Sequence, residues 1–211
     1  MFDAALRRAL APSLDRAGVA LAQRGWRAGS LTMAGLLVGV GAIGAVLAHQ
    51  WLWALAAWWV NRVLDGLDGA LARRRGTTEL GGFLDVMADF SIYSGMPLVV
   101  AVVEPGARLA TAVLLTTYYL SGTALLAGSA ILDRKGVARD ERSLRLLGGL
   151  AEGAETVAAY SVLLAWPSGA SVIEWVFAAL VGVTAVQRVV RVARVLRASG
   201  VISEDPSAQS L

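Results

Sequence analysis

DGLDGALARRRGTTELGGFLDVMAD, residues 65–89, contains four aspartates in or beside strongly apolar segments of the chain: Asp65, Asp68, Asp85 and Asp89. A charged carboxylate at the centre of a membrane helix costs about 2.5–3.5 kcal/mol, so four of them facing lipid would cost about 10 kcal/mol or more. The first pair is three residues apart and the second four, so each pair shares one face of a helix, within about 60°. Two such helices lying side by side would bring four hard oxygen ligands to one point, which suits magnesium or manganese rather than a soft metal.

The apolar segments around this stretch predict an integral membrane protein. Of the 211 residues, 56% are hydrophobic, and crossing a bilayer takes about 20 residues of helix. Apolar runs lie at 31–48, 51–60, 83–103, 109–132, 146–166 and 172–187. The second run is too short by itself, so we expect its helix to continue to about Arg73 and to carry Asp65 and Asp68 at its inner end. The sequence therefore predicts an all-α fold, a bundle of six transmembrane helices.

The basic residues predict the orientation of these helices. Eighteen of the 19 lysines and arginines lie before the first span, around the second-to-third turn, in the fourth-to-fifth loop or at the end of the sixth span. Only Arg108 falls in a loop on the other side. By the positive-inside rule we expect both termini in the cytoplasm of a bacterial inner (plasma) membrane, with the aspartates open to the cytoplasm. The positive charge borders membrane spans, so no nucleic acid partner is expected.

The chain is expected to form one membrane domain, residues 30–197, between two flanking segments. Residues 1–29 predict an amphipathic helix on the inner leaflet, broken or offset near Pro12; a merely solvated basic segment is the alternative. Residues 198–211 are mostly polar and are expected to be disordered. The sequence has no cysteine, and its single histidine, His49, falls in a short external turn. Thiolate sites, zinc and histidine catalysis are therefore poor candidates.

Small residues and one arginine follow the first aspartate pair. Gly69 and Ala72 have small side chains, so they leave room for a bulky ligand on the aspartate face of the helix. Arg73 would place a guanidinium about 12 Å along the helix from Asp65. A metal-bridged diphosphate would suit such a helix, because its carboxylates can bind the metal, its small side chains leave room and its arginine can bind phosphate oxygens. Gly81 opens the third helix in the same way. Tight helix packing would also explain the glycines, but it does not explain the four acids.

A motif across the second and third spans resembles the signature of the CDP-alcohol phosphotransferase family, the class I integral membrane enzymes. It reads Asp65-x-x-Asp68-Gly69-x-x-Ala72-Arg73, then Gly81-x-x-x-Asp85-x-x-x-Asp89. Eight positions in fixed order within 25 residues make the resemblance specific, and it extends over about residues 30–195. One departure is the turn: seven residues separate Arg73 from Gly81, one fewer than is usual in the family. The shorter turn leaves the placement of Glu79 and Leu80 open.

The resemblance implies that the four aspartates hold two divalent cations, magnesium or manganese, against the diphosphate of a CDP-linked donor such as CDP-diacylglycerol. It implies a donor site lined by the following residues: Asp65, Asp68, Gly69, Ala72, Arg73 and Gly81. Asp89 would take the proton from an acceptor hydroxyl as that hydroxyl attacks the β-phosphorus and expels CMP. A role in phospholipid or related biosynthesis and assembly as a homodimer are also expected from the family.

The acceptor alcohol is less well defined by the sequence. Glu152 and Glu155 lie three residues apart at the start of the fifth span, on the same side of the membrane as the aspartates. They would repel a phosphorylated acceptor and favour a neutral or cationic one, unless loop arginines such as Arg142 and Arg145 fold over the site. Structural pairing of the glutamates with those arginines is the alternative.

Two other functions compete with the transferase. A cation- or proton-coupled transporter also needs intramembrane carboxylates, but it predicts acids spread through the membrane depth and paired broken helices. In this sequence the acids cluster at one side. A catalytically inactive member of the family is disfavoured by the retention of all four aspartates. The sequence therefore favours metal-dependent transfer of a phospho-alcohol group from a CDP-linked donor.

Overall fold

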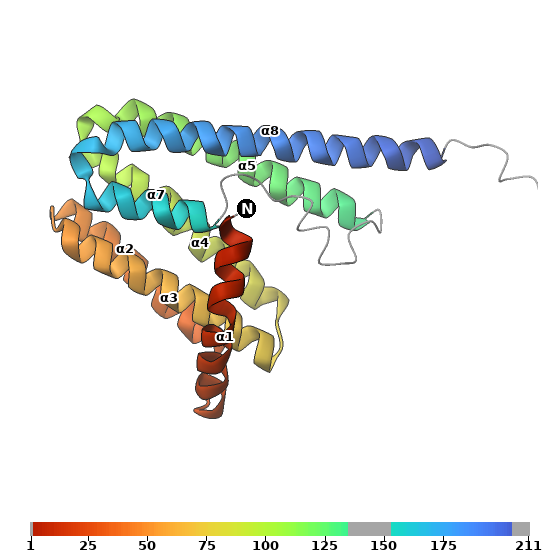
Figure 1. Ribbon diagram of the computed structural model, residues 1–211, viewed down its shortest axis with the longest axis horizontal. Helices are drawn as coiled ribbons and strands as arrows, with labels where there is room; N and C mark the ends of the chain where they lie inside the picture. Colours follow the sequence, from red (N-terminus) through yellow and green to blue (C-terminus); the bar gives the residue numbers. More distant parts are fainter. Residues whose placement is uncertain (1, 135–152, 204–211) are drawn as a thin grey trace, which may run out of the picture. The chain divides into compact units, whose positions relative to one another are not determined.

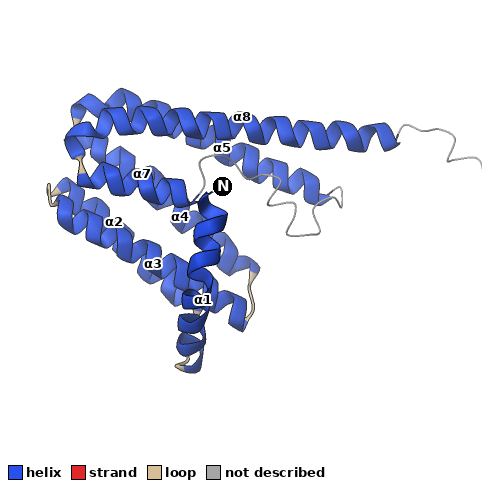
Figure 2. Cartoon of the chain, viewed as in Figure 1, coloured by secondary structure: helices blue, strands red, loops and turns tan. Residues whose placement is uncertain are grey.

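The structure is a computed structural model that describes residues 2–134 and 153–203. These residues are helical apart from short turns, and no strand occurs among them (Figure 2). The all-α prediction is confirmed. Contacts divide the described residues into two compact units, one formed by residues 2–112 and 153–175 and the other by residues 113–134 and 176–203.

The helices are labelled in chain order in Figure 1. Their bounds are α1 Phe2–Gln23, α2 Ala28–Leu47, α3 Trp51–Arg75, α4 Glu79–Val103, η1 Pro105–Ala107, α5 Arg108–Arg134, α7 Gly153–Ala165, η2 Pro167–Gly169 and α8 Ala170–Ser203. The six predicted apolar runs correspond to α2, α3, α4, α5, α7 and α8. The second predicted helix continues past its short apolar run, as expected, and ends at Arg75.

Four helical segments of the described chain are long and apolar enough to cross a membrane: Ala28–Leu47, Glu79–Val103, Pro105–Arg134 and Pro167–Ala198. Helix α3 is also long, with 25 residues, but its second half carries the charged residues of the motif. Helix α7 is described over 13 residues. The structure thus supports a multi-pass membrane protein, whereas the count of six spans stays a prediction.

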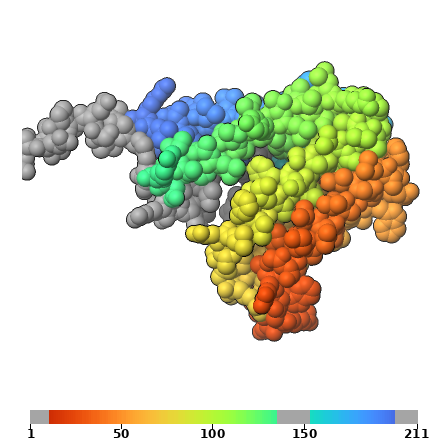
Figure 3. All heavy atoms as spheres, turned by 180° about the vertical axis from the view of Figure 1, so that it is seen from behind, coloured from red at the N-terminus to blue at the C-terminus, as the bar shows by residue number. Residues whose placement is uncertain are grey.

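Helix α2 packs closely on α3 and α4 because small residues line its inner face. Gly35 and Gly39 are one turn apart and both buried, and a Cβ atom added at Gly39 would lie 2.6 Å from Cδ1 of Ile92 on α4. A Cβ atom at Gly35 would lie 3.6 Å from Leu64 on α3. Figure 3 shows α2 and α4 side by side on the face turned away in Figure 1. These glycines let three helices approach at the level of the aspartates.

Helix α1 runs unbroken through Pro12, so the predicted break there is wrong, whereas an offset of the helix at Pro12 stays a prediction. A proline inside a helix costs about 3 kcal/mol, because it removes a hydrogen bond and crowds the preceding turn. Packing against α3 offsets this cost: Leu14 lies against Gly66, and Gly18 lies against Ala70, with a Cβ at Gly18 only 3.1 Å from the Ala70 backbone. The amphipathic character of α1 and its place on the inner leaflet remain predictions.

The second unit consists of the long remainders of α5 and α8. Arg188 on α8 donates from Nη1 to the hydroxyl of Ser121 on α5 at 2.7 Å and to its carbonyl at 3.1 Å. Tyr118 and Phe177 meet edge to face, with ring centroids 6.1 Å apart. Polar and aromatic contacts between α5 and α8 therefore hold the second unit together. Helix α8 continues to Ser203, beyond the point where the polar tail was expected to begin.

Candidate active site

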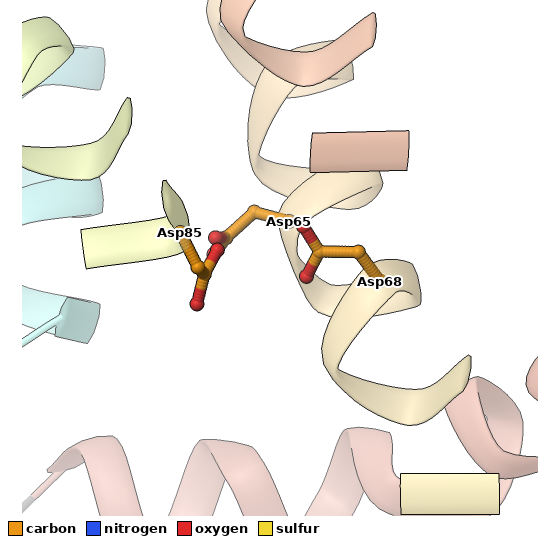
Figure 4. Close-up of side chains that lie close together, drawn as sticks. All are labelled: Asp65, Asp68 and Asp85. Carbon is orange, nitrogen blue, oxygen red and sulfur yellow. The ribbon is translucent and has the colours of Figure 1, made fainter. Parts of the chain in front are cut away.

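Three of the four predicted aspartates converge in the first unit. Asp65 and Asp68 come from α3 and Asp85 from α4, and one carboxylate oxygen of each lies within 4.8 Å of the others. Figure 4 shows the three side chains reaching toward one another from the two helices. Asp68 is only 4% exposed, and the other two are partly buried. Such a group of hard oxygen ligands is what a divalent cation requires.

The short turn between α3 and α4 brings the aspartates together. It consists of residues 76–78, and Gly76 has a φ of +97°, a conformation that suits glycine. Thr78 caps α4, because its Oγ1 accepts a hydrogen bond from the Gly81 N–H at 3.0 Å. Glu79 and Leu80 form the first turn of α4. The turn is shorter than usual in the motif, yet it still lets Asp85 reach the aspartates of α3.

Asp89 lies one turn further along α4 and lines the same pocket, but it is not one of the three converging carboxylates. Its Oδ1 accepts a hydrogen bond from Nη2 of Arg62 at 3.1 Å. The pocket is lined by Thr32, Gly35, Leu36, Asn61, Arg62, Asp65, Asp68, Asp85, Ala88 and Asp89. The two helix faces predicted from the spacing thus meet at one pocket.

The pocket holds more negative than positive charge. Arg62 pairs with Asp89 at 3.1 Å and lies 3.7 Å from Asp65. Within residues 2–134 and 153–203, neither Asp68 nor Asp85 has an ion pair; Asp68 accepts a hydrogen bond from the Thr32 hydroxyl at 2.8 Å. One guanidinium therefore faces four carboxylates. This deficit fits the binding of divalent cations, whose charge would balance the acids.

The other predicted donor-site residues lie just outside that pocket lining. Gly69 follows Asp65 by one turn, and a Cβ there would lie 3.5 Å from Nη1 of Arg73, so the guanidinium lies over the glycine. Arg73 is exposed and pairs with Asp15 of α1 at 3.4 Å. Ala72 is partly exposed beside them. Gly81 takes part in the cap of α4, which gives it a local structural role as well.

The predicted acceptor residues are only partly covered by the structure. Glu155 lies in the first turn of α7 and is partly buried. Arg142, Arg145 and Glu152 lie outside the described residues. An acceptor site formed by these four residues stays a prediction.

Comparison with known proteins identifies the family of this motif. Residues 26–187 match the family described as CDP-alcohol phosphatidyltransferase. The chain belongs to this family. It is 36% identical over 196 residues to the inner membrane protein YnjF of Escherichia coli K12, a match that covers 90% of this chain and 94% of that protein.

Two crystal structures of a Mycobacterium tuberculosis enzyme share the fold of this CDP-alcohol phosphatidyltransferase. Both are of phosphatidylinositol phosphate synthase, one with CDP-DAG bound and one in complex with manganese and citrate. Each has a TM-score of 0.64 and covers 85% of this chain. They are 24% and 23% identical to it, and the matches cover 92% and 88% of the neighbours' chains.

Membership of the family confirms the predicted enzyme class. The chain is a membrane transferase that acts on a CDP-linked donor and an alcohol acceptor, and the family uses divalent metals, for which the aspartate cluster offers ligands. The transporter alternative is not supported. The name of the Escherichia coli relative fits a bacterial inner membrane.

Sequence reasoning missed several residues that support the phosphatidyltransferase site. From the sequence, Arg62 is expected only as a basic residue at a membrane boundary, and Asn61 has no predicted role. A polar Asn-Arg pair one turn before Asp65, inside an apolar helix, was the signal that could have found both. Thr32 carries no such local signal, because it reaches the site from α2. Tyr93 lies on α4, one turn after Asp89, but an aromatic residue in an apolar span does not by itself indicate a site.

Proposed function

We propose that this protein transfers a phosphatidyl-type group from a CDP-linked donor, CDP-diacylglycerol or a similar lipid, to an acceptor alcohol and releases CMP. The observation that carries the proposal is the convergence of Asp65, Asp68 and Asp85 beside Arg62, which is the one guanidinium that lines the pocket in the part of the chain that the structure describes. The structural neighbour with CDP-DAG bound supports this class of donor. Such a reaction belongs to phospholipid or related biosynthesis.

Asp65, Asp68, Asp85 and Asp89 are the residues that would hold two divalent cations, magnesium or manganese. The cations would neutralise the donor's diphosphate and make CMP a better leaving group. The site suits them because its ligands are hard oxygens and, among the described residues, its acids outnumber its basic side chains. The neighbour in complex with manganese supports the same choice of metal.

Gly69, Ala72, Arg73 and Gly81 would bind the CDP part of the donor. The first two leave room beside the α3 backbone, and Arg73 supplies a guanidinium that can bind a phosphate oxygen through two N–H groups. The pair between Arg73 and Asp15 is exposed, and exposed pairs contribute about 0–1 kcal/mol. Arg73 can therefore exchange Asp15 for a donor phosphate at small cost.

Asp89 would act as the general base. Its side chain lines the pocket and is 28% exposed, so an acceptor hydroxyl can reach it. As the carboxylate takes the hydroxyl proton, the hydroxyl oxygen forms a bond to the β-phosphorus, and the bond from that phosphorus to the bridging oxygen of CMP breaks. A base of this kind contributes about 10²–10⁴-fold to turnover.

The acceptor would be a neutral or cationic alcohol if Glu152 and Glu155 line its site. Two unit charges about 4 Å apart repel by about 4 kcal/mol at an effective dielectric near 20, which is close to a thousandfold in affinity. Changing both glutamates to glutamine should therefore improve the use of phosphorylated alcohols and weaken the use of a cationic one. A wild type that prefers a phosphorylated acceptor, unchanged in the double variant, would make the glutamates structural. Arg142 and Arg145 would then be the candidates for binding that phosphate.

Release of radiolabelled CMP from CDP-diacylglycerol tests the proposed function. The full chain, purified in detergent with magnesium or manganese, is mixed with a panel of acceptor alcohols. CMP release that depends on one acceptor supports the proposal and identifies that alcohol. Folded, metal-loaded protein that releases no CMP from any CDP-linked donor with any acceptor refutes it.

The topology and assembly are part of the same proposal. We infer six spans, both termini in the cytoplasm of the inner membrane, and a homodimer. Because the chain has no cysteine, a single cysteine introduced near either end can be labelled selectively with a membrane-impermeant reagent. Labelling of either end in intact cells would contradict the cytoplasmic orientation, and monomers after cross-linking in membranes would contradict the dimer.

A further inference from the structure

A buried arginine joins the two halves of the aspartate motif. The Arg62 side chain on α3 is only 7% exposed. It donates from Nη2 to Asp89 at 3.1 Å and from Nη1 to the Tyr93 hydroxyl at 2.6 Å, both on α4. Its Nη1 also lies 3.7 Å from Asp65. The guanidinium therefore bridges α3 and α4 beside the converging carboxylates.

The position of this guanidinium is fixed from several sides. Its Nε donates to Oδ1 of Asn61 at 2.8 Å, and the Asn61 amide donates in turn to the Gly35 carbonyl of α2 at 2.8 Å. The central guanidinium carbon lies 4.8 Å from the ring centroid of Trp58 and 4.9 Å from that of Tyr93. Arg62 thus has little freedom to move, which is what a group that orients another side chain needs.

Tyr93 is itself held from a fourth helix. Tyr160 on α7 donates its hydroxyl to the Tyr93 carbonyl at 2.6 Å. The centroids of Trp58 and Tyr160 are 5.4 Å apart, and both residues are almost fully buried. Side chains and backbone from α2, α3, α4 and α7 therefore meet around one charged group. Burying that charge is costly, and a well-packed apolar residue of similar volume is often as stable or more so.

We propose that Arg62 is a positioning residue that orients the Asp89 carboxylate for proton transfer. The inference rests on the proposed function, in which Asp89 takes the proton of the acceptor hydroxyl. Helix packing alone would not require a guanidinium aimed at a carboxylate of the motif. Arg62 donates a hydrogen bond to Asp89 and none to Asp68, which has its own support from Thr32. Loss of the guanidinium fork should therefore affect turnover more than donor binding.

Arg62→Lys keeps the positive charge but loses the planar fork that reaches Asp89, Tyr93 and Asn61 together. Loss of a group that orients a catalytic ligand typically costs about 10–100-fold in activity. We expect kcat for CMP release to fall by about that factor, while KM for the CDP-linked donor changes by less than about threefold. Arg108→Lys is the matched control, because Arg108 contacts the Ala101 carbonyl outside the pocket. It should keep wild-type kcat.

A double-mutant cycle separates orientation of Asp89 from a general effect on packing. If Arg62 acts through Asp89, Arg62→Lys should lower kcat by less than about threefold in the Asp89→Asn background. Tyr93→Phe provides a milder test, since it removes one hydrogen bond to Arg62 and keeps the ring. It should lower kcat in the same direction and be similarly masked by Asp89→Asn. Thermal unfolding in detergent is measured for every variant, and Tyr93→Phe decides if Arg62→Lys does not fold.

The outcomes distinguish this role from the proposed function. A fall in kcat that Asp89→Asn masks supports the inference. An active wild type whose Arg62→Lys and Tyr93→Phe variants keep wild-type kcat overturns the role of Arg62 alone, as does a loss that is equally large with and without Asp89→Asn. A folded wild type that releases no CMP from any CDP-linked donor overturns the proposed function and this role with it.

Discussion

Replacing Thr32 by valine should weaken metal binding without disturbing the fold. Thr32 lies on α2, and its hydroxyl is 2.8 Å from Oδ2 of Asp68 and 3.2 Å from the Ala28 carbonyl of its own helix. The hydroxyl has one proton, and the closer, charged acceptor is favoured. Valine has nearly the same shape and the same branched Cβ, so the change removes the hydrogen bond and little else.

The size of the effect follows from the burial of Asp68. This carboxylate is 4% exposed, so water cannot readily replace the lost donor. A hydrogen bond to a charged group contributes about 1.5–3 kcal/mol, and each 1.4 kcal/mol is a tenfold change in an equilibrium constant. Without the Thr32 hydroxyl, Asp68 is less well oriented as a ligand. We expect manganese affinity to fall by about 10–100-fold.

Electron paramagnetic resonance of free Mn²⁺ measures this affinity directly in detergent-purified protein, and a metal titration of CMP release gives a second estimate. Thr32→Ser is the matched control, because it keeps the hydroxyl and should bind manganese about as well as the wild type. If Thr32→Val binds manganese as tightly as Thr32→Ser, then the hydrogen bond does not support a metal ligand.

Three further outcomes are expected. Excess EDTA should abolish CMP release and added Mg²⁺ or Mn²⁺ should restore it; full activity in metal-free protein would contradict the role of the aspartates. Asp89→Asn should lower kcat by about 10²–10⁴-fold with little change in donor affinity, whereas Asp68→Asn should weaken metal and donor binding together; wild-type turnover in the first variant would exclude Asp89 as the base. Gly39→Ala should cost about 1–3 kcal/mol of stability and lower the melting temperature, because its Cβ would lie 2.6 Å from Cδ1 of buried Ile92. Gly41→Ala should leave the melting temperature unchanged, because a Cβ there meets nothing within 4 Å. Equal melting temperatures for the Gly39 and Gly41 variants would contradict the tight packing of α2 on α4.

The helices could be predicted because their signals are local. Apolar runs and the charges that interrupt them located α2 to α5 and the start of α8, and the need for about 20 residues extended α3 into the charged motif. The convergence of Asp65, Asp68 and Asp85 was also predictable, since three- and four-residue spacings fix the helix faces and a short turn makes the two helices neighbours. Pro12 shows the limit of such reasoning, because α3 stabilises a helix that its own sequence disfavours.

The supporting residues could not be predicted because their contacts join different helices and leave no local signal in the sequence. An arginine at a membrane boundary is expected from topology alone, so the position of Arg62 beside Asn61, one turn before Asp65, indicates a polar helix face but not that Arg62 binds Asp89. Thr32 is 36 residues from its partner Asp68, and no periodic pattern links them. Such contacts are set by how α2, α3 and α4 pack, which depends on glycines whose neighbours only the structure shows.

The aspartate pocket contains groups that offset part of its negative charge. Four carboxylates in a partly buried site repel one another, and nothing in the motif itself offsets that repulsion inside the pocket, since Arg73 faces Asp15 instead. Arg62 offsets part of it by pairing with carboxylates of both helices, while Thr32 from α2 holds Asp68. These contacts join α2, α3 and α4 around the pocket. Bound divalent cations would supply the remaining positive charge. The carboxylates that the chemistry requires are visible in the motif, whereas Arg62 and Thr32, which support them, lie outside it.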